Sequence, residues 1–170
     1  MTGVYPFFVT GLPRSRTAWF SVYLNRLGFA CEHELIAQCR TQKEFYERCA
    51  TTGNSDSGLY LTDFQKVFPL ARTVVIHRDR EEVYESAVHL VGMDLPPLRD
   101  ELYKQDQRLW DINGMHIAYN DINAKLRAIS VYLVGTYDKD IADACIAENI
   151  QFPLVNGDIA AETMETWRWE

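Results

Sequence analysis

Two short apolar runs, the first followed by a loop and a helical pattern and the second directly by a helical pattern, place the strongest constraint on the fold of this 170-residue chain. Val4–Thr10 reads VYPFFVT and Thr73–His77 reads TVVIH, and both are rich in β-branched or aromatic residues. A continuous apolar run of this length is typical of a strand buried on both faces, as in a parallel sheet. Strands that alternate with helices on this scale predict an α/β fold with a mostly parallel central sheet.

The other elements follow weaker patterns of apolar spacing and turn residues. Helices are predicted over residues 17–27, 42–49, 98–129 (with a break near Asn113-Gly114) and 140–149, and directly after a cap at Asp79. Further strands are predicted at residues 29–31, 58–62 and 131–136, which gives a sheet of about five strands flanked by helices. The stretch TTGNSDS at residues 51–57 is predicted to be a loop, because of its Gly, Asn, Asp and Ser content.

Composition indicates a single domain, residues 1–170, and limits the classes of partner. The formal net charge is −7, whereas nonspecific nucleic-acid binders carry a basic surplus, so we expect no nucleic-acid partner. No run approaches the roughly 20 apolar residues that span a bilayer, so we expect no membrane partner. The four cysteines lack the spacing of a metal site and are expected to be reduced thiols in a cytoplasmic protein.

The most informative local segment is Thr10–Trp19, which reads TGLPRSRTAW where a strand gives way to a helix. The first N–H groups of a helix have no internal partner, and the helix dipole is positive there, so a loop at this end can hold a phosphate or sulfate. Pro13 has no N–H, so the donors begin at Arg14, whose guanidinium adds a fixed charge. The hydroxyls of Ser15 and Thr17 add further donors.

Two plainer interpretations of this loop remain open. It can be a turn with a Ser or Thr helix cap and two solvated arginines. It can also belong to a nucleotide or small-molecule kinase with a related phosphate loop. However, the Gly-Lys-Ser/Thr ending of an ATP-binding loop is missing, so no lysine is placed for that role.

The segment Pro13–Thr17 (PRSRT), with Trp19 two residues later, resembles the 5′-phosphosulfate loop of sulfotransferases that use 3′-phosphoadenosine 5′-phosphosulfate (PAPS). In that family the loop typically reads [KR]-S-G-T after a proline, and T-W often follows. The resemblance implies that the donor is held here by Pro13, Arg14, Ser15, Arg16, Thr17, Ala18 and Trp19.

The resemblance also implies a role for individual positions in the loop. Arg14 would contact the bridging and transferring groups of the donor, and Ser15 and Thr17 would bind its 5′-phosphate. Trp19 would lie near the adenine. Arg16 stands where the family usually has glycine, so it either strains a backbone that needs a positive φ or adds another charge to the anion site.

A second motif lies after the second apolar run, where Arg78 follows the strand and Ser86 lies two helical turns further on. The carboxyl ends of parallel strands are where ligands of α/β proteins bind, so these two side chains can converge on one anion. The pair resembles the family's 3′-phosphate site, in which an Arg and a Ser at this separation hold the donor. The family's Asn-Pro after the arginine is replaced by Asp79-Arg80, and Asp79 suits a phosphate only if its carboxylate caps the helix.

The resemblance extends weakly to the end of the chain through VYLVGTYD at residues 131–138 and NIQFP at residues 149–153. It implies a three-layer fold of the P-loop NTPase-like class. The chain is shorter than most members of the family, which implies a shortened acceptor region or a missing donor lid.

Sulfuryl transfer needs positive charge on the leaving phosphate and a base for the acceptor proton. Arg14 is the candidate for the charge. The cluster that follows the first helix supplies candidate bases, with Glu34 first, Glu32 second and His33 third, because some branches of the family use a glutamate in this region. Asp63 is a fourth candidate. Each can equally be a solvated loop charge or a helix cap.

The sequence therefore predicts a cytoplasmic sulfotransferase that moves a sulfuryl group from PAPS to a hydroxyl or amine of a small-molecule or glycan acceptor. Adenosine 3′,5′-bisphosphate would be the product, and no metal is required in principle. The alternatives are the kinase above and a catalytically inactive nucleotide-binding or assembly module. We expect the histidines at positions 77, 89 and 116 to be structural.

Overall fold

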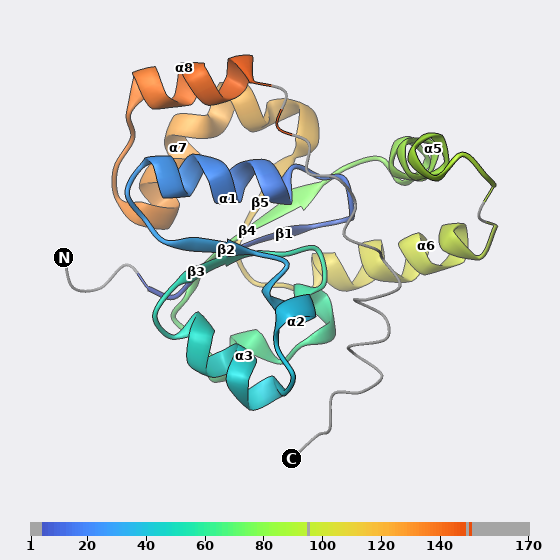
Figure 1. Ribbon diagram of the computed structural model, residues 1–170, viewed down its shortest axis with the longest axis horizontal. Coiled ribbons are helices and arrows are strands. Elements are labelled where there is room, and N and C mark those ends of the chain that lie inside the picture. Colours follow the sequence, from blue (N-terminus) through green and yellow to red (C-terminus); the bar gives the residue numbers. More distant parts are fainter. Residues whose placement is uncertain (1–4, 95, 149, 151–170) are drawn as a thin grey trace.

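The computed structural model describes residues 5–94, 96–148 and 150, which form a five-stranded sheet with helices on both faces (Figure 1). The strand order is β2-β3-β1-β4-β5, and every neighbouring pair is parallel. The strands are β1 (Phe7–Gly11), β2 (Cys31–His33), β3 (Gly53–Ser55), β4 (Arg72–His77) and β5 (Met115–Ala118). The predicted α/β class with a parallel sheet of about five strands is confirmed.

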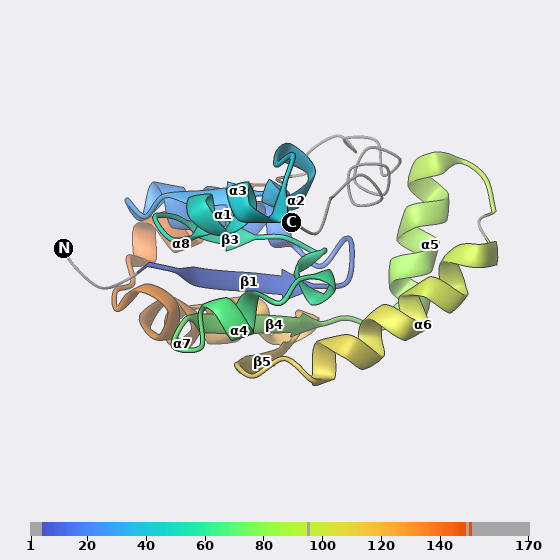
Figure 2. The ribbon, with the colours of Figure 1, turned by 90° about the horizontal axis from the view of Figure 1, so that it is seen from below.

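The helices form two layers and one projecting hairpin (Figures 1 and 2). One face of the sheet is covered by α1 (Thr17–Arg26), α7 (Ile122–Val134) and α8 (Lys139–Ala147). The other is covered by α2 (Leu35–Gln38), α3 (Gln42–Cys49), the 3-10 turn η1 (Leu59–Leu61) and α4 (Phe64–Val67). Beyond the carboxyl ends of the strands stands α5 (Arg80–Val91), and α6 (Pro96–Trp110) runs back from it toward the start of β5 and buries Leu102 and Leu109 in the core of the second face (Figure 2). The turn η2 (Tyr119–Asp121) leads into α7.

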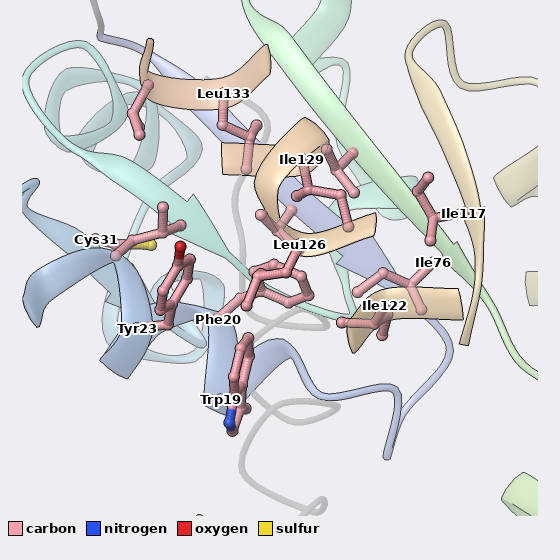
Figure 3. Close-up of a cluster of buried hydrophobic side chains, with 14 of the residues drawn as sticks. Trp19, Phe20, Tyr23, Cys31, Ile76, Ile117, Ile122, Leu126, Ile129 and Leu133 are labelled. Atoms are coloured by element: carbon pink, nitrogen blue, oxygen red, sulfur yellow. The ribbon is translucent and has the colours of Figure 1, made fainter. Parts of the chain in front are cut away.

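The two central strands explain why the apolar runs in the sequence are continuous. Phe7 and Val9 of β1 face the helices α1 and α7, whereas Phe8 between them faces the opposite layer, and all three are fully buried. Successive side chains of a strand point to opposite faces, so a strand covered on both sides is apolar at every position. Figure 3 shows the buried apolar cluster between the sheet and the layer of α1, α7 and α8, in which aromatic rings from α1 meet aliphatic side chains from α7.

Two neighbouring predictions, the loop at residues 51–57 and the strand at residues 58–62, are wrong. Gly53–Ser55 forms β3 inside the stretch predicted as a loop, and residues 58–62 contain the 3-10 turn η1. The ring of Phe7 occupies the space that a β-carbon at Gly53 would need, so this position requires glycine. The strand exists because its backbone pairs with β1 and β2, not because its residues favour strands.

The prediction for the last strand is also wrong. Residues 131–134 belong to α7, and β5 lies at Met115–Ala118, within the stretch predicted to be helical. Leu126, Ile129 and Leu133 of α7 are buried on one helical face, so packing overrides the β-branched character of this segment. Of the stretch 149–153, only Ile150 is among the described residues. Within the described part of the chain, no helix has the length and apolar character needed to cross a bilayer.

Candidate anion-binding site

The loop between β1 and α1 is tight and held in an unusual backbone conformation. A β-carbon at Gly11 would lie 2.7 Å from the carbonyl oxygen of Ile76 and 3.2 Å from Cβ of Ser15, so only glycine fits there. Arg14 and Arg16 both have φ of 66°, in the left-handed region. Each such residue costs about 1–2 kcal/mol, and strain of this kind is concentrated at functional sites.

At the start of α1, the described residues supply neither a side-chain cap for the first backbone N–H groups nor a partner for one buried hydroxyl. Arg16 is the N-cap of the ten-residue helix α1, and its side chain makes no capping hydrogen bond. Ser15 is fully buried, and its Oγ has no hydrogen-bond partner in the described part of the chain. A buried hydroxyl without a partner costs about 1–3 kcal/mol, so each such group needs an explanation, and an anion at the helix start would supply one.

Arg14 joins the loop to the second motif. Its Nε donates to Oγ of Ser86 on α5 at 3.3 Å, and its carbonyl oxygen accepts a hydrogen bond from Nη1 of Arg78 at 2.6 Å. The structure thus brings together the residues of the two motifs, which are separated by more than 60 positions in the sequence. The two candidate phosphate contacts lie on the same carboxyl edge of the sheet, next to the start of α1.

The guanidinium of Arg78 is fixed by its surroundings. It lies 4.3 Å from the ring centroid of Tyr119, its Nε lies 3.5 Å from Oε2 of Glu82, and its side chain is 17% exposed. Asp79 does not compete for it, because Oδ1 of Asp79 accepts the backbone N–H groups of Glu81 and Glu82. The predicted cap of α5 at Asp79 is therefore confirmed.

Arg16 reaches toward the other side of the loop. Its Nη1 donates to Oδ1 of Asn123 on α7 at 2.7 Å, and its guanidinium lies 4.9 Å from the centroid of the Trp19 indole. The expectation that this position has a positive φ is confirmed, and the expectation that Arg16 adds charge to an anion site stays a prediction. Pro13 and Ala18 are half-buried beside it.

Trp19 is placed in the core rather than in the site. It is 2% exposed, its ring stacks on Tyr23 at 5.2 Å, and its indole N–H donates to the carbonyl oxygen of Cys145 at 2.8 Å (Figure 3). The expected contact of Trp19 with adenine is not supported by this position, because the N–H and one face of the ring are already engaged. Thr17 is also buried, and its carbonyl oxygen accepts the hydroxyl of Ser55 at 2.7 Å.

The charges around the loop do not cancel. Arg14 and Arg16 have no carboxylate partner among the described residues, and their acceptors are the neutral oxygens of Ser86 and Asn123. Arg78 has one carboxylate neighbour, at the long distance of 3.5 Å. A local excess of positive charge therefore stands at one edge of a chain whose net charge is −7, which is what anion binding requires.

The four candidate bases have different surroundings. Glu32 is paired with Arg48 at 3.1 Å, and Asp63 with Lys66 at 2.8 Å. At the end of β2, Nδ1 of His33 lies 2.8 Å from the carbonyl oxygen of Ser55, so this nitrogen carries the proton when the ring is neutral.

Two of the candidates remain connected to the loop. Nε2 of His33 lies 3.5 Å from Oε1 of Glu34, whose backbone is left-handed with φ of 51°. Ser55 contacts both His33 and the carbonyl of Thr17, so it connects this pair to the loop. Glu32 and Asp63 are held instead by Arg48 and Lys66.

Sequence reasoning missed a buried carboxylate next to this pair. Asp56 is 4% exposed and accepts the backbone N–H groups of Ile36 at 3.1 Å and Gly58 at 2.7 Å, and burial raises its pKa. It shapes the connection after β3. Asn123 and the contact of Tyr119 with Arg78 were also missed, because nothing in the sequence around them shows that β5 lies beside β4.

Two histidines beyond the loop form a hydrogen-bonded chain. Nε2 of His116 lies 2.8 Å from the carbonyl oxygen of Ile112, so it is the donor, and Nδ1 of His116 accepts from Nε2 of His77 at 2.7 Å. Nδ1 of His77 is buried without a partner in the described residues, and Trp110 stacks on its ring at 3.7 Å. Burial, together with the neighbouring His116, lowers the pKa of His77.

No group of three or more potential metal ligands is present among the described residues. Neither the models of known protein families nor the curated proteins contain a match to this chain.

Proposed function

We propose that the protein binds PAPS at the β1–α1 loop and transfers the sulfuryl group to a hydroxyl or amine acceptor. The observation that carries the proposal is the set of three guanidinium groups at the loop, those of Arg14, Arg16 and Arg78, whose acceptors are mostly neutral. Such a set is suited to an anion with more than one negative group. The resemblance of the loop and of Arg78 and Ser86 to the PAPS family supplies the identity of that anion.

The architecture agrees with this proposal. The loop follows β1, the central strand, at the carboxyl edge of a parallel sheet, where α/β proteins bind their ligands. We extend the proposal to the fold class and infer a three-layer, P-loop NTPase-like domain. The N-terminus of α1 and the buried hydroxyl of Ser15 would receive the 5′-phosphosulfate, and Arg78 with Ser86 would receive the 3′-phosphate.

In the proposed reaction the acceptor oxygen or nitrogen forms a bond to sulfur, and the bond between sulfur and the bridging oxygen breaks. The bridging oxygen leaves with the phosphate, where negative charge increases, and the guanidinium of Arg14 would stabilise that charge. The acceptor proton passes to a base. His33 and Glu34, which share the end of β2 and connect to the loop through Ser55, are the candidates that the surroundings favour.

The test compares ligands that differ by one phosphate. Adenosine 3′,5′-bisphosphate should raise the melting temperature more than AMP, because AMP offers nothing to Arg78 and Ser86. At a concentration of 100 times the dissociation constant, a ligand stabilises the native state by about 2.7 kcal/mol. Equal shifts with both nucleotides would contradict the 3′-phosphate assignment.

Measurements with ATP and magnesium, and with PAPS and a set of acceptors, separate the alternative functions. Binding of ATP that depends on magnesium and is stronger than binding of the bisphosphate would favour a kinase. Binding of the bisphosphate without release of product from PAPS, across hydroxyl and amine acceptors, would favour a binding module that has lost its chemistry.

A further inference from the structure

Glu82 is the carboxylate that lies nearest to the three arginines of the loop within the described residues. It belongs to the first turn of α5, four residues after Arg78, and its Oε2 lies 3.5 Å from Nε of that arginine. The three guanidinium groups otherwise contact neutral oxygens and aromatic rings. Glu82 therefore sets the charge that an incoming anion meets at Arg78.

The two partners of this contact differ in exposure and in the number of their other contacts. The side chain of Arg78 is 17% exposed and is held by the carbonyl oxygen of Arg14 and by the ring of Tyr119. The side chain of Glu82 is 52% exposed, and Arg78 is the one partner that its carboxylate has among the described residues. Exposed ion pairs at such distances contribute little to stability, so Glu82 can turn into solvent while Arg78 stays in place.

We infer that Glu82 is a specificity-determining residue, which competes with the second phosphate of the nucleotide for Arg78. This inference rests on the proposed function. A phosphate monoester that approaches Arg78 meets a carboxylate of the same sign, and the repulsion lasts until Glu82 moves away. A nucleotide with a free hydroxyl at that position meets no such repulsion. Glu82 thus reduces the preference for the bisphosphate over AMP.

The neighbouring Glu81 provides a matched control. It lies in the same turn of α5, and its N–H also donates to Asp79, but its Oε2 contacts Arg99 at 3.3 Å instead of Arg78. Glu81→Gln and Glu82→Gln remove the same charge from the same helix end, so they share any effect on the helix dipole and on net charge.

The experiment is a calorimetric titration of the wild-type protein and both variants with adenosine 3′,5′-bisphosphate and with AMP. We expect Glu82→Gln to bind the bisphosphate about threefold to tenfold more tightly, and AMP within about twofold of wild type. Glu81→Gln should stay within about twofold for both ligands. In an Arg78→Gln background, the gain from Glu82→Gln should disappear.

The outcomes separate the inference from the proposed function. If the wild-type protein prefers the bisphosphate but Glu82→Gln binds it no more tightly than Glu81→Gln does, the role of Glu82 is overturned and the donor site stands. If the wild-type protein and Glu82→Gln both bind the two nucleotides equally, the 3′-phosphate site is contradicted and the inference fails with it. Circular dichroism spectra equal to wild type show that each variant is folded.

Discussion

Arginines at the carboxyl edge of the sheet and arginines elsewhere in the molecule have different partners. Away from the loop, Arg26 makes two hydrogen bonds to Glu148, at 2.7 and 2.8 Å, and Arg48 pairs with Glu32 at 3.1 Å. At the loop, Arg14 and Arg16 contact a serine hydroxyl and an asparagine amide. Arg26 and Arg48 are thus paired with carboxylates, whereas Arg14 and Arg16 have neutral acceptors and keep their charge uncompensated.

This difference bears on function more than on stability. An exposed pair such as Arg26 with Glu148 contributes little to the free energy of unfolding. A cluster of three like charges with Glu82 as its one carboxylate neighbour among the described residues is unfavourable, and two left-handed residues add strain at the same place. A ligand with several negative groups would relieve the repulsion, so the two regions should respond very differently to the same substitution.

The largest expected effect comes from Arg14. Arg14→Ala should weaken binding of adenosine 3′,5′-bisphosphate by about 10- to 100-fold, since a charge-assisted hydrogen bond is worth about 1.5–3 kcal/mol. Arg26→Ala is the control and should leave the dissociation constant within about twofold of wild type. Calorimetry measures both, and similar losses in the two variants would remove the distinction between the regions.

Arg78 and Arg72 permit a sharper comparison, because they flank the same strand. Arg72 begins β4 and donates to the carbonyl oxygen of Tyr132 at 3.0 Å, whereas Arg78 follows β4 and donates to the carbonyl oxygen of Arg14 at 2.6 Å. Arg78→Gln should weaken bisphosphate binding about tenfold and leave AMP binding nearly unchanged. Arg72→Gln should change neither, and a tenfold loss there would show that a general charge effect is at work.

Arg16 tests whether strain or charge dominates at the loop. Arg16→Gly loses the contacts with Asn123 and Trp19 but relieves a left-handed backbone, so its stability should lie within about 1 kcal/mol of wild type. Arg16→Ala loses the contacts and keeps the strain, so it should be about 1 kcal/mol less stable than Arg16→Gly. Both should bind the bisphosphate about twofold to fivefold more weakly. Urea unfolding and calorimetry measure these quantities.

How far the sequence predicts this molecule depends on whether local residues or tertiary neighbours decide the structure. β1 and β4 were predictable because burial on both faces leaves a continuous apolar run. β3 was not, because Gly-Asn-Ser is typical of a turn and becomes a strand only between two others. The segment 131–134 has strand-like residues, yet the helical spacing of its buried neighbours prevails in α7.

In the candidate site, too, some features follow from local residues and others depend on tertiary neighbours. The convergence of Arg14, Arg78 and Ser86 was predictable, because parallel strands bring their carboxyl ends to one edge. The contacts of Tyr119 and Asn123 were not, because they depend on β5 being the neighbour of β4. The burial of Trp19 was also hidden, since a tryptophan next to a loop can face either a ligand or the core.

A smaller effect is expected from His77, at the end of β4, and its hydrogen-bonded neighbour His116 in β5. The pKa of His77 is lowered by burial and by His116, while Asp106 on α6 opposes this shift. The unfolded chain therefore takes up a proton near pH 6.5 before the native state does, and the free energy of unfolding falls as the pH falls through that value.

Replacement of the imidazole tests this pH dependence. His77→Phe keeps a ring against Trp110 but cannot be protonated, so its melting temperature should fall less than that of wild type between pH 7.5 and 5.5. His77 ends β4, so a proton on it would also add positive charge at the edge of the sheet where the three guanidinium groups lie. Saturating bisphosphate should therefore reduce the loss of stability at low pH in the wild-type protein, because it supplies the missing counter-charge. An unchanged loss in its presence would show that the histidine pair and the loop respond to charge independently.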